Sequence, residues 1–306
     1  MFLSRLSSVH PDEVLGNADL ARMVDTTDEW IVEHVGIRER RRLRADEPVH
    51  GLGARAAREA LAGEPEVEAV VCGLSIGDFH IPATANLIAA EAGCQGAAAF
   101  DIRAACSSFV FALHALRGML AGGLLQRALL VVPEAYSRVM DYRDRSTCVL
   151  FGDGAFACLV TRDPPAGRSL RVLDTMIGSA SAGARTIHAE VGGHFVQDGP
   201  VVQRFAIKKM AELVEVMTGR HGKAEWLVGH QANLGILERV AARAGIAPDR
   251  NLTNIQRYGN CGAAGAPAVL AENMVRFTPG QRIALATVGA GLSWGGAFLQ
   301  ATGSDP

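Results

Sequence analysis

The chain has 306 residues, of which 49% are hydrophobic and 20% are charged, and its formal net charge is −2. This composition is typical of a globular protein with a large core and excludes a disordered chain. The near-neutral charge gives no electrostatic support for binding nucleic acid. No uncharged apolar run reaches the roughly 20 residues that a membrane-spanning helix needs, so we expect no membrane partner.

The cysteines and the first residues indicate the compartment in which the protein works. None of the six cysteines forms a C-x-x-C pair, which argues against a zinc site or a redox motif. Most of them lie in apolar segments, as reduced core cysteines do. Residues 1–6 lack the apolar stretch of a signal peptide. We therefore expect a cytoplasmic protein that binds no metal.

Apolar segments alternate with helical periodicity along the chain. In chain order we predict a helix over 53–62, a strand over 67–74, a buried helix that starts at Cys106, strands over 127–133 and 156–161, and a helix over 202–217. Apolar strands that alternate with helices are typical of proteins in which helices cover both faces of a sheet. The sequence therefore predicts a layered α/β fold.

The second part of the chain repeats a pattern of the first part. In each part a helix that starts with small residues is followed by a strand, a glycine-rich turn and a final strand. The matching segments are 104–109 and 152–160 in the first part, and 259–264 and 291–300 in the second. This repetition predicts two similar halves, residues 1–165 and 166–306, whose equivalent helices meet at the centre and bring distant residues into one site.

Cys106 is the strongest candidate nucleophile in the sequence. Small residues precede it and a long apolar stretch follows it, which places it in the first turn of a buried helix. The dipole and the free N–H groups of a helix start stabilise a thiolate, so we expect a lowered pKa for this thiol. His230 and Asn260 also stand in turns rich in Gly and Ala. Each of the three alone has an ordinary structural explanation, but their joint occurrence in turns that a ligand can approach favours a site.

Six segments form an ordered set of motifs, at residues 25–40, 104–109, 144–155, 230–233, 258–260 and 289–295. Their order and spacing resemble those of the β-ketoacyl-acyl carrier protein synthase III family, within the thiolase superfamily. The resemblance extends along nearly the full chain. It implies a thiolase fold, with two similar βαβαβαββ halves in a layered α-β-α-β-α arrangement. It also implies a homodimeric acyltransferase of fatty acid or polyketide biosynthesis.

The resemblance implies a catalytic set of Cys106, His230 and Asn260. The Cys106 thiolate would attack an acyl-CoA and form an acyl-enzyme. The backbone N–H groups of Cys106 and Ala290 would stabilise the oxyanion. A malonyl thioester, carried by acyl carrier protein or by CoA, would then lose CO2, and His230 and Asn260 would donate to the enolate oxygen. Because loss of CO2 replaces removal of a proton by a base, no cofactor and no metal is implied, and acyl-CoA is a substrate.

Other positions match residues that bind substrate in the family. Trp30 and Arg145 correspond to residues on either side of the CoA adenine. Ile81, in the loop 78–82, corresponds to a residue that reaches into the acyl pocket of the partner subunit in family dimers. Asn233 corresponds to a residue near the histidine and would support the site structurally.

Basic residues recur at helical spacing in two later segments, as Arg204, Lys208 and Lys209 in the first and Arg239 and Arg243 in the second. Residues four apart lie on one face of a helix. Acyl carrier proteins are acidic, so such a patch would steer one toward the site. An ordinary solvated helix face is the alternative.

The sequence departs from the family pattern at several positions. Ser108 and Gly262 stand close to the nucleophile and to Asn260 where the family usually has Gly and Ser, and Gly235 and His34 replace family arginines. These departures leave the acyl-cysteine chemistry untouched but weaken the assignment to fatty-acid initiation. A specialised member that passes the acyl group to another carbon, oxygen or nitrogen nucleophile in secondary metabolism is one alternative.

Two further alternatives concern the chemistry itself. A Cys-His-Asn thioester hydrolase or peptidase would release a free acid or cleave a peptide. A non-catalytic acyl-binding protein is expected to have lost its nucleophile, whereas Cys106 is present. The glycine-rich turn at 152–157 precedes an apolar strand instead of a helix, so the context of a nucleotide-binding motif is missing.

Overall fold

The computed structural model describes residues 1–64 and 66–303. Its strands are β1 (Phe2–Val9), β2 (Glu13–Gly16), β3 (Glu39–Arg42), β4 (Ala69–Gly73), β5 (Ala98–Ile102), β6 (Arg127–Ala135), β7 (Asp153–Thr161), β8 (Ser169–Ser179), β9 (Ile187–Ala189), β10 (Phe195–Gln197), β11 (Trp226–Gly229), β12 (Asn251–Leu252), β13 (Arg282–Gly289) and β14 (Ser293–Thr302). Its α-helices are α1 (Asn17–Leu20), α2 (Asp28–His34), α3 (Val49–Leu61), α4 (Thr84–Ala92), α5 (Ser108–Ala121), α6 (Arg145–Cys148), α7 (Gly199–His221), α8 (Leu234–Arg243), α9 (Ile255–Tyr258) and α10 (Gly262–Asn273). The 3-10 turns next to the site are η1 (Ala105–Ser107), η2 (Tyr136–Arg138) and η6 (Ala290–Leu292).

The main sheet has ten strands in the order β12-β11-β13-β14-β8-β1-β7-β6-β4-β5. Read outward from its centre, each half repeats one arrangement: two antiparallel pairings, followed by two parallel pairings. The halves are joined where β1 pairs with β8, at Phe2–Arg171 and Leu3–Leu170. The placement of a domain boundary between residues 165 and 166 stays a prediction.

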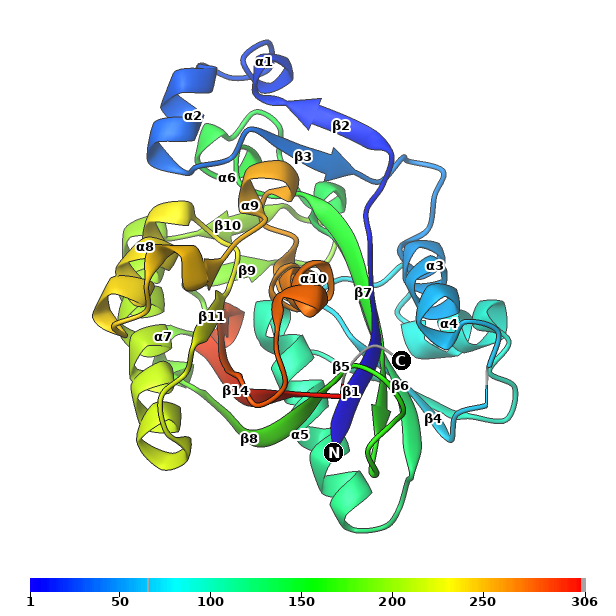
Figure 1. Cartoon of the computed structure of the whole chain (residues 1–306). Coiled ribbons are helices and arrows are strands. Elements are labelled where there is room, and N and C mark those ends of the chain that lie inside the picture. The colour runs from blue at the N-terminus through cyan, green and yellow to red at the C-terminus, as the bar shows by residue number, and fades with distance from the viewer. Residues whose placement is uncertain (65, 304–306) are drawn as a thin grey trace.

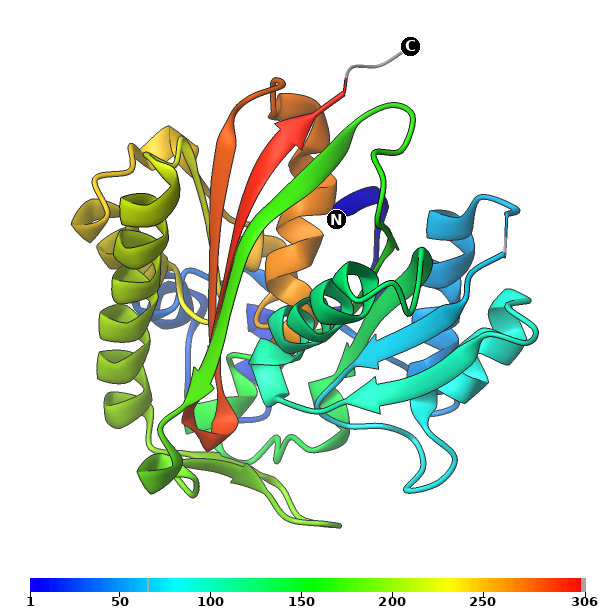
Figure 2. The same ribbon diagram turned by 90° about the horizontal axis from the view of Figure 1, so that it is seen from below.

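Helices form the other layers of the molecule. Figures 1 and 2 show α5 and α10 between the two halves of the sheet, with α3 and α4 outside one half and α7 and α8 outside the other. The α5 sequence is apolar on nearly all sides, as a helix between two sheets must be, and its Phe109 meets Phe156 of β7 edge to face at 5.5 Å. The layered α-β-α-β-α architecture predicted from the sequence is confirmed.

Two predicted elements differ from the observed ones at their ends. Strand β6 continues through Pro133 to Ala135, where the sequence suggested an end at the proline. Pro133 is accommodated opposite Ala155 in the antiparallel ladder with β7. Helix α7 begins earlier than predicted because the Asp198 side chain accepts from the Val201 N–H and caps it. None of the described helices is long and apolar enough to cross a membrane.

A buried arginine fixes the segment that carries Trp30. Arg40 is 1% exposed and donates to the Asn17 side chain and to the Val149 carbonyl, each at 2.6 Å. Asn17 in turn donates to Asp28, the first residue of α2, at 2.7 Å. This chain of hydrogen bonds runs from the buried Arg40 and Asn17 to the exposed Asp28 and ties α2, which carries Trp30, to the body of the protein.

Candidate active site

Cys106, His230 and Asn260 line one cavity of about 560 Å³. Cys106 lies in η1 just before α5, His230 follows β11, and Asn260 precedes α10. The cavity also reaches Trp30 and His34 near the surface. The structure therefore brings together the three residues that the sequence singled out, at the inner end of a passage from solvent.

A strained turn presents the Cys106 sulfur to the cavity. Ala105 has a φ of 48°, in the left-handed region that a residue with a Cβ rarely adopts. Ser108 holds the turn, because its Oγ accepts from the Ala104 N–H at 2.8 Å and lies 2.7 Å from the Ala105 carbonyl oxygen. This serine, one of the departures from the family pattern, therefore has a defined structural role.

The expectation of a lowered pKa for Cys106 is wrong. Burial raises the pKa of this thiol to about 12, although a hydrogen bond with Tyr136 acts in the opposite direction. The side chain is 8% exposed, so a thiolate there would lose most of its hydration. Cys106 is consequently a neutral thiol at neutral pH, and forming its thiolate would require a group that accepts the proton.

The backbone of Gly289 and Ala290 lies against the start of the Cys106 helix. A Cβ on Gly289 would stand 2.8 Å from the Cys106 amide nitrogen and 3.1 Å from that of Ser107. Ala290 lines the same cavity. Only glycine leaves this space clear, so an oxygen atom of a ligand has access to backbone N–H donors there. The arrangement suits an oxyanion hole.

The side chain of His230 is a neutral imidazole in the site. Burial lowers the pKa of its ring to about 4, so the ring is uncharged at neutral pH. Its backbone N–H donates to the Ala286 carbonyl at 2.9 Å, and its Nδ1 has no hydrogen-bond partner among the described residues. The next residue, Gln231, donates to the Gly229 carbonyl at 2.8 Å and accepts from the Asn254 N–H at 3.0 Å. The loop is thus held rigidly while the imidazole keeps hydrogen-bonding capacity for a ligand.

Asn260 offers its amide group to the same cavity. Its side-chain Oδ1 accepts from the Gly262 N–H at 3.0 Å, which leaves the NH2 group as the available donor. Its backbone is tied to the segment just before β7, because its N–H donates to the Leu150 carbonyl and its carbonyl accepts from the Gly152 N–H. His230 and Asn260 together supply two uncharged donors, which suit an oxygen that becomes negative during a reaction.

Trp30 and Arg145 are in direct contact at the mouth. The Arg145 guanidinium carbon lies 4.2 Å from the Trp30 ring centroid, and the His34 ring stacks on Trp30 at 4.6 Å. An adenine between Trp30 and Arg145 would need a separation of roughly 7 Å, which is two stacking distances. Arg145 would therefore have to move aside for a ring to enter, and the role of the two residues on either side of the CoA adenine stays a prediction.

The predicted dimer loop lies away from the cavity of its own chain. Ile81 is 85% exposed and is not part of the cavity wall. The loop is anchored through Asp78, which accepts from the backbone N–H groups of Val49 and His50 at 2.8 and 2.9 Å. The contribution of Ile81 to a partner subunit stays a prediction.

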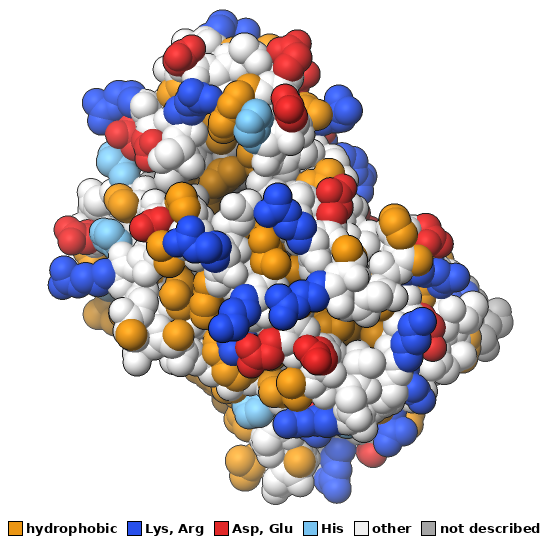
Figure 3. All heavy atoms as spheres, turned by 90° about the vertical axis from the view of Figure 1, so that its left-hand side faces the viewer, with side chains coloured by type: hydrophobic (Ala, Val, Ile, Leu, Met, Phe, Trp, Pro, Cys, Tyr) orange, Lys and Arg blue, Asp and Glu red, His pale blue; other side chains and the backbone are white. Residues whose placement is uncertain are grey.

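Basic side chains lie on the face over α7 and α8, where Figure 3 shows them interspersed with hydrophobic ones. Arg204 and Lys208 on α7 are exposed, and so are Arg239 and Arg243 on α8. Lys209 is less available, because it pairs with Glu212 at 2.9 Å and lies 5.0 Å above the Trp294 ring. Four of the five predicted residues are therefore free to face solvent on two adjoining helices.

Several residues of the site were missed from the sequence. Tyr136 contacts the Cys106 sulfur at 3.4 Å, and Ser75 and Glu134 lie behind it. Phe151 stacks on Tyr136 at 4.6 Å and Phe195 meets it edge to face at 5.7 Å. Of these residues, only Glu134 could have been recognised from the sequence, because it is a carboxylate at the end of an otherwise apolar strand.

The groups of His, Cys, Asp and Glu side chains in the described part of the chain include none that could hold a metal ion.

Comparison with known proteins gives one consistent family. Sequence models of the 3-oxoacyl-[acyl-carrier-protein (ACP)] synthase III family match residues 100–181 and, for its C-terminal part, 220–301. The beta-ketoacyl-[acyl-carrier-protein] synthase III 2 of Deinococcus radiodurans is 39% identical over 95% of this chain and 91% of its own. The synthase III of Symbiobacterium thermophilum is 36% identical over 97% of each. The crystal structure of 3-oxoacyl-[acyl-carrier-protein] synthase III from Aquifex aeolicus VF5 superposes with a TM-score of 0.92 at 32% identity, over 98% of this chain and 99% of that one. The resemblance noted in the sequence is confirmed, and the chain belongs to the 3-oxoacyl-[acyl-carrier-protein] synthase III family of acyltransferases.

Proposed function

We propose that the protein takes an acyl group from acyl-CoA onto Cys106 and condenses it with a malonyl thioester, giving a β-ketoacyl product. The observation that carries this proposal is the composition of one cavity: a thiol, a backbone cradle for an oxyanion, and two neutral donors. Acyl transfer needs the first two, and stabilisation of an enolate needs the last.

In the first half-reaction the Cys106 sulfur attacks the acyl carbonyl. The carbonyl oxygen becomes negative in the space that Gly289 leaves open, where backbone N–H groups of Cys106 and Ala290 stabilise it. Collapse of this intermediate breaks the bond to CoA and leaves the acyl group on the sulfur. Trp30 and Arg145 at the mouth bind the nucleotide end of CoA after Arg145 swings away from the indole.

In the second half-reaction a malonyl thioester occupies the emptied passage. The bond to its carboxylate breaks, CO2 leaves, and the electron pair forms an enolate. His230 and Asn260 donate to the enolate oxygen, which a neutral imidazole and an amide can do without giving up a proton. The enolate carbon attacks the thioester on Cys106, forms the new C–C bond and expels the cysteine sulfur.

The acyl group accepted by Cys106 is proposed to be short. Tyr136, Phe151 and Phe195 form a packed aromatic cluster beside the sulfur. The cavity of about 560 Å³ also contains the passage to Trp30, so only part of it is available for the acyl chain.

We propose malonyl-acyl carrier protein as the acceptor, with malonyl-CoA as the alternative. The exposed basic side chains over α7 and α8 would face the acidic carrier protein (Figure 3). A homodimer, in which Ile81 of each subunit faces the other, and a cytoplasmic location complete the proposal.

A product assay tests this function. The protein is given a series of acyl-CoAs of increasing chain length together with malonyl-carrier protein, malonyl-CoA, or an alcohol or amine, and the products are identified by mass. A β-ketoacyl product that Cys106→Ser abolishes is expected. Free acid as the main product would instead identify a hydrolase, and an ester or amide would identify a specialised acyltransferase.

A further inference from the structure

Acyl transfer to Cys106 requires a group that accepts the proton of its buried thiol. A line of hydrogen bonds starts at that sulfur. Cys106 Sγ lies 3.4 Å from the Tyr136 hydroxyl, which lies 2.9 Å from Ser75 Oγ, and Ser75 Oγ donates to Glu134 Oε1 at 2.7 Å. We propose that Tyr136 and Ser75 relay the thiol proton to Glu134 when the sulfur attacks, and return it when the acyl group leaves; this inference rests on the proposed function.

The direction of the hydrogen bonds follows from the donors that are available. Glu134 accepts from the Ser75 N–H and from the Ala263 N–H, each at 3.2 Å. These contacts favour the carboxylate, but burial outweighs them and raises the pKa of Glu134 to about 8, so the arrangement below is that of the ionised form near and above this pH. With Ser75 Oγ–H donated to Glu134, the Tyr136 O–H must donate to Ser75, so the tyrosine oxygen accepts from the Cys106 S–H. When Glu134 takes the proton all three bonds reverse, and Tyr136 O–H donates to the Cys106 thiolate.

Each proton and electron pair is accounted for in this cycle. The Cys106 S–H bond breaks as the S–C bond forms, one proton passes along the two hydroxyls to Glu134, and CoA leaves as a thiolate that is protonated by water. In the condensation the enolate attack expels the Cys106 thiolate. The proton on Glu134 then returns along the same line and restores the thiol.

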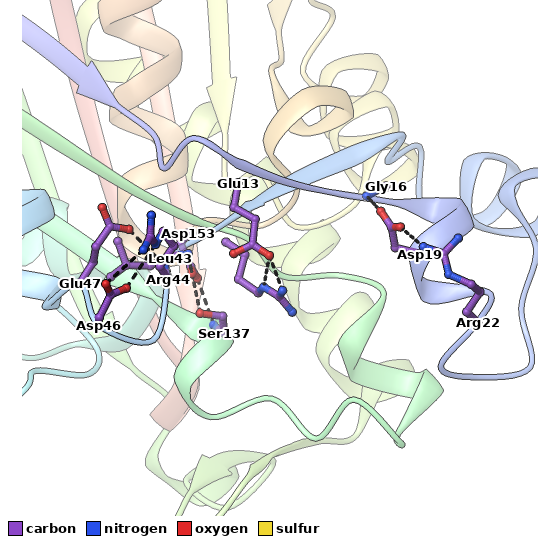
Figure 4. Close-up of polar contacts among 11 residues, drawn as sticks. Glu13, Gly16, Asp19, Arg22, Leu43, Arg44, Asp46, Glu47, Ser137 and Asp153 are labelled. Carbon is purple, nitrogen blue, oxygen red and sulfur yellow. Dashed lines mark hydrogen bonds and ion pairs between the residues drawn. The ribbon is translucent and has the colours of Figure 1, made fainter.

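The surroundings hold the relay in place. Asp153 accepts from the Ser137 N–H at 3.0 Å, from the Ser137 hydroxyl and from the Leu43 N–H, which fixes the turn next to Tyr136 (Figure 4). Gly262 lies on the other side with a φ of 54°, and any Cβ there would collide with the Tyr136 ring and approach Glu134 Cδ to 3.0 Å. The Gly262 departure from the family pattern thus makes room for the tyrosine and the carboxylate together.

The titratable groups around the relay leave Glu134 as its proton acceptor. Burial raises the pKa of Glu134 to about 8. The neighbouring Cys72 and Cys261 thiols have a pKa well above their ordinary value, since both are buried. Burial also raises the pKa of Asp153, and the pKa of His230 is about 4. Because the relay needs ionised Glu134, reaction at Cys106 should rise with pH up to about 8 and then level off.

The test is the rate at which iodoacetamide alkylates Cys106 between pH 6 and 10, followed by mass in the full-length protein. This reaction needs no CoA, carrier protein or oxyanion hole, so it examines the relay even if no acyl-CoA reacts. At pH 8 and above, Tyr136→Phe, Ser75→Ala and Glu134→Gln are each expected to react roughly 100-fold more slowly, the lower end of what a positioned proton acceptor contributes. Their rates should keep rising with pH where the wild type levels off.

The Glu134→Gln variant distinguishes proton transfer to Glu134 from a purely electrostatic effect of the Glu134 charge on Cys106. The negative charge of Glu134 raises the pKa of Cys106, so its removal without a relay would make the thiol more reactive. Faster alkylation of Glu134→Gln, or a wild-type pH profile in Tyr136→Phe, would overturn the relay. Tyr142→Phe is the matched control, because its hydroxyl interacts with Arg42 and is outside the line; it is expected to follow the wild type.

Discussion

Replacing Gly289 by alanine is expected to block acyl transfer while leaving the fold intact. The new Cβ would stand 2.8 Å from the Cys106 nitrogen and 3.1 Å from the Ser293 hydroxyl oxygen. The nitrogen cannot give way easily, because it belongs to the strained turn at Ala105. Gly289 itself has a φ of −154°, which any residue adopts, so alanine can take up this backbone conformation and the strain comes only from the close contacts of the new Cβ, above all with the Cys106 nitrogen. The methyl group would therefore occupy the place of the oxyanion.

The size of the effect follows from the donors that are lost. Removal of one oxyanion donor costs about 100- to 1000-fold in rate, or roughly 3–4 kcal/mol. We expect a loss of this size in the rate at which acyl-CoA acylates Cys106, measured by intact mass in single turnovers. Alkylation of Cys106 by iodoacetamide, which forms no oxyanion, should change much less.

Gly199→Ala is the matched control for this experiment. Gly199 also lines the cavity, but a Cβ there meets nothing within 4 Å. This variant should acylate at the wild-type rate, and thermal unfolding should show that both variants are folded. Wild-type acylation by Gly289→Ala would refute the assigned position of the oxyanion hole.

Other predictions test the remaining parts of the site. His230→Ala and Asn260→Ala should still acylate Cys106 but lose roughly 100-fold or more in malonyl decarboxylation, assayed by CO2 release; equal loss in both half-reactions would contradict their role. The pKa of His230 is about 4 in the folded chain, against its ordinary value of 6.5. As the pH falls from 6.5 to 4, the histidine of the unfolded chain is therefore protonated before that of the folded chain, and the free energy of unfolding should decrease. The contribution is at most about 3 kcal/mol and should disappear from denaturant titrations of His230→Gln. Trp30→Ala should raise KM for acyl-CoA about 3- to 10-fold, as loss of one aromatic stack does, and leave KM for an acyl-pantetheine unchanged; a similar change for both substrates would place the adenine elsewhere.

The three candidate residues could be found in the sequence because they are polar residues that stand out against their surroundings. Cys106, His230 and Asn260 each interrupt a run of small or apolar residues, and the structure places all three on one cavity. The layered fold followed from apolar strands that alternate with helices, and the repeated pattern reappears as one strand order in both halves of the sheet.

The residues of the site that could not be predicted from the sequence are brought together by contacts between neighbouring strands of the sheet. Tyr136 and Ser75 meet only because β6 and β4 are neighbours, and no local pattern marks either residue as part of the site. The sign of the Cys106 pKa shift was wrong for a related reason. A helix start favours the thiolate, but the aromatic cluster of Tyr136, Phe151 and Phe195 excludes water from the sulfur. Burial therefore raises the pKa of the thiol by more than the helix start lowers it.

The proposed acyl-enzyme is tested most directly by the mass of the intact protein after exposure to a short acyl-CoA and then to malonyl-acyl carrier protein. We expect one acyl group on Cys106, absent in Cys106→Ser and present in Cys94→Ser, which disappears on addition of the malonyl thioester as CO2 and a β-ketoacyl product form. A β-ketoacyl product formed equally well by Cys106→Ser, or an acyl group carried by another residue, would contradict it.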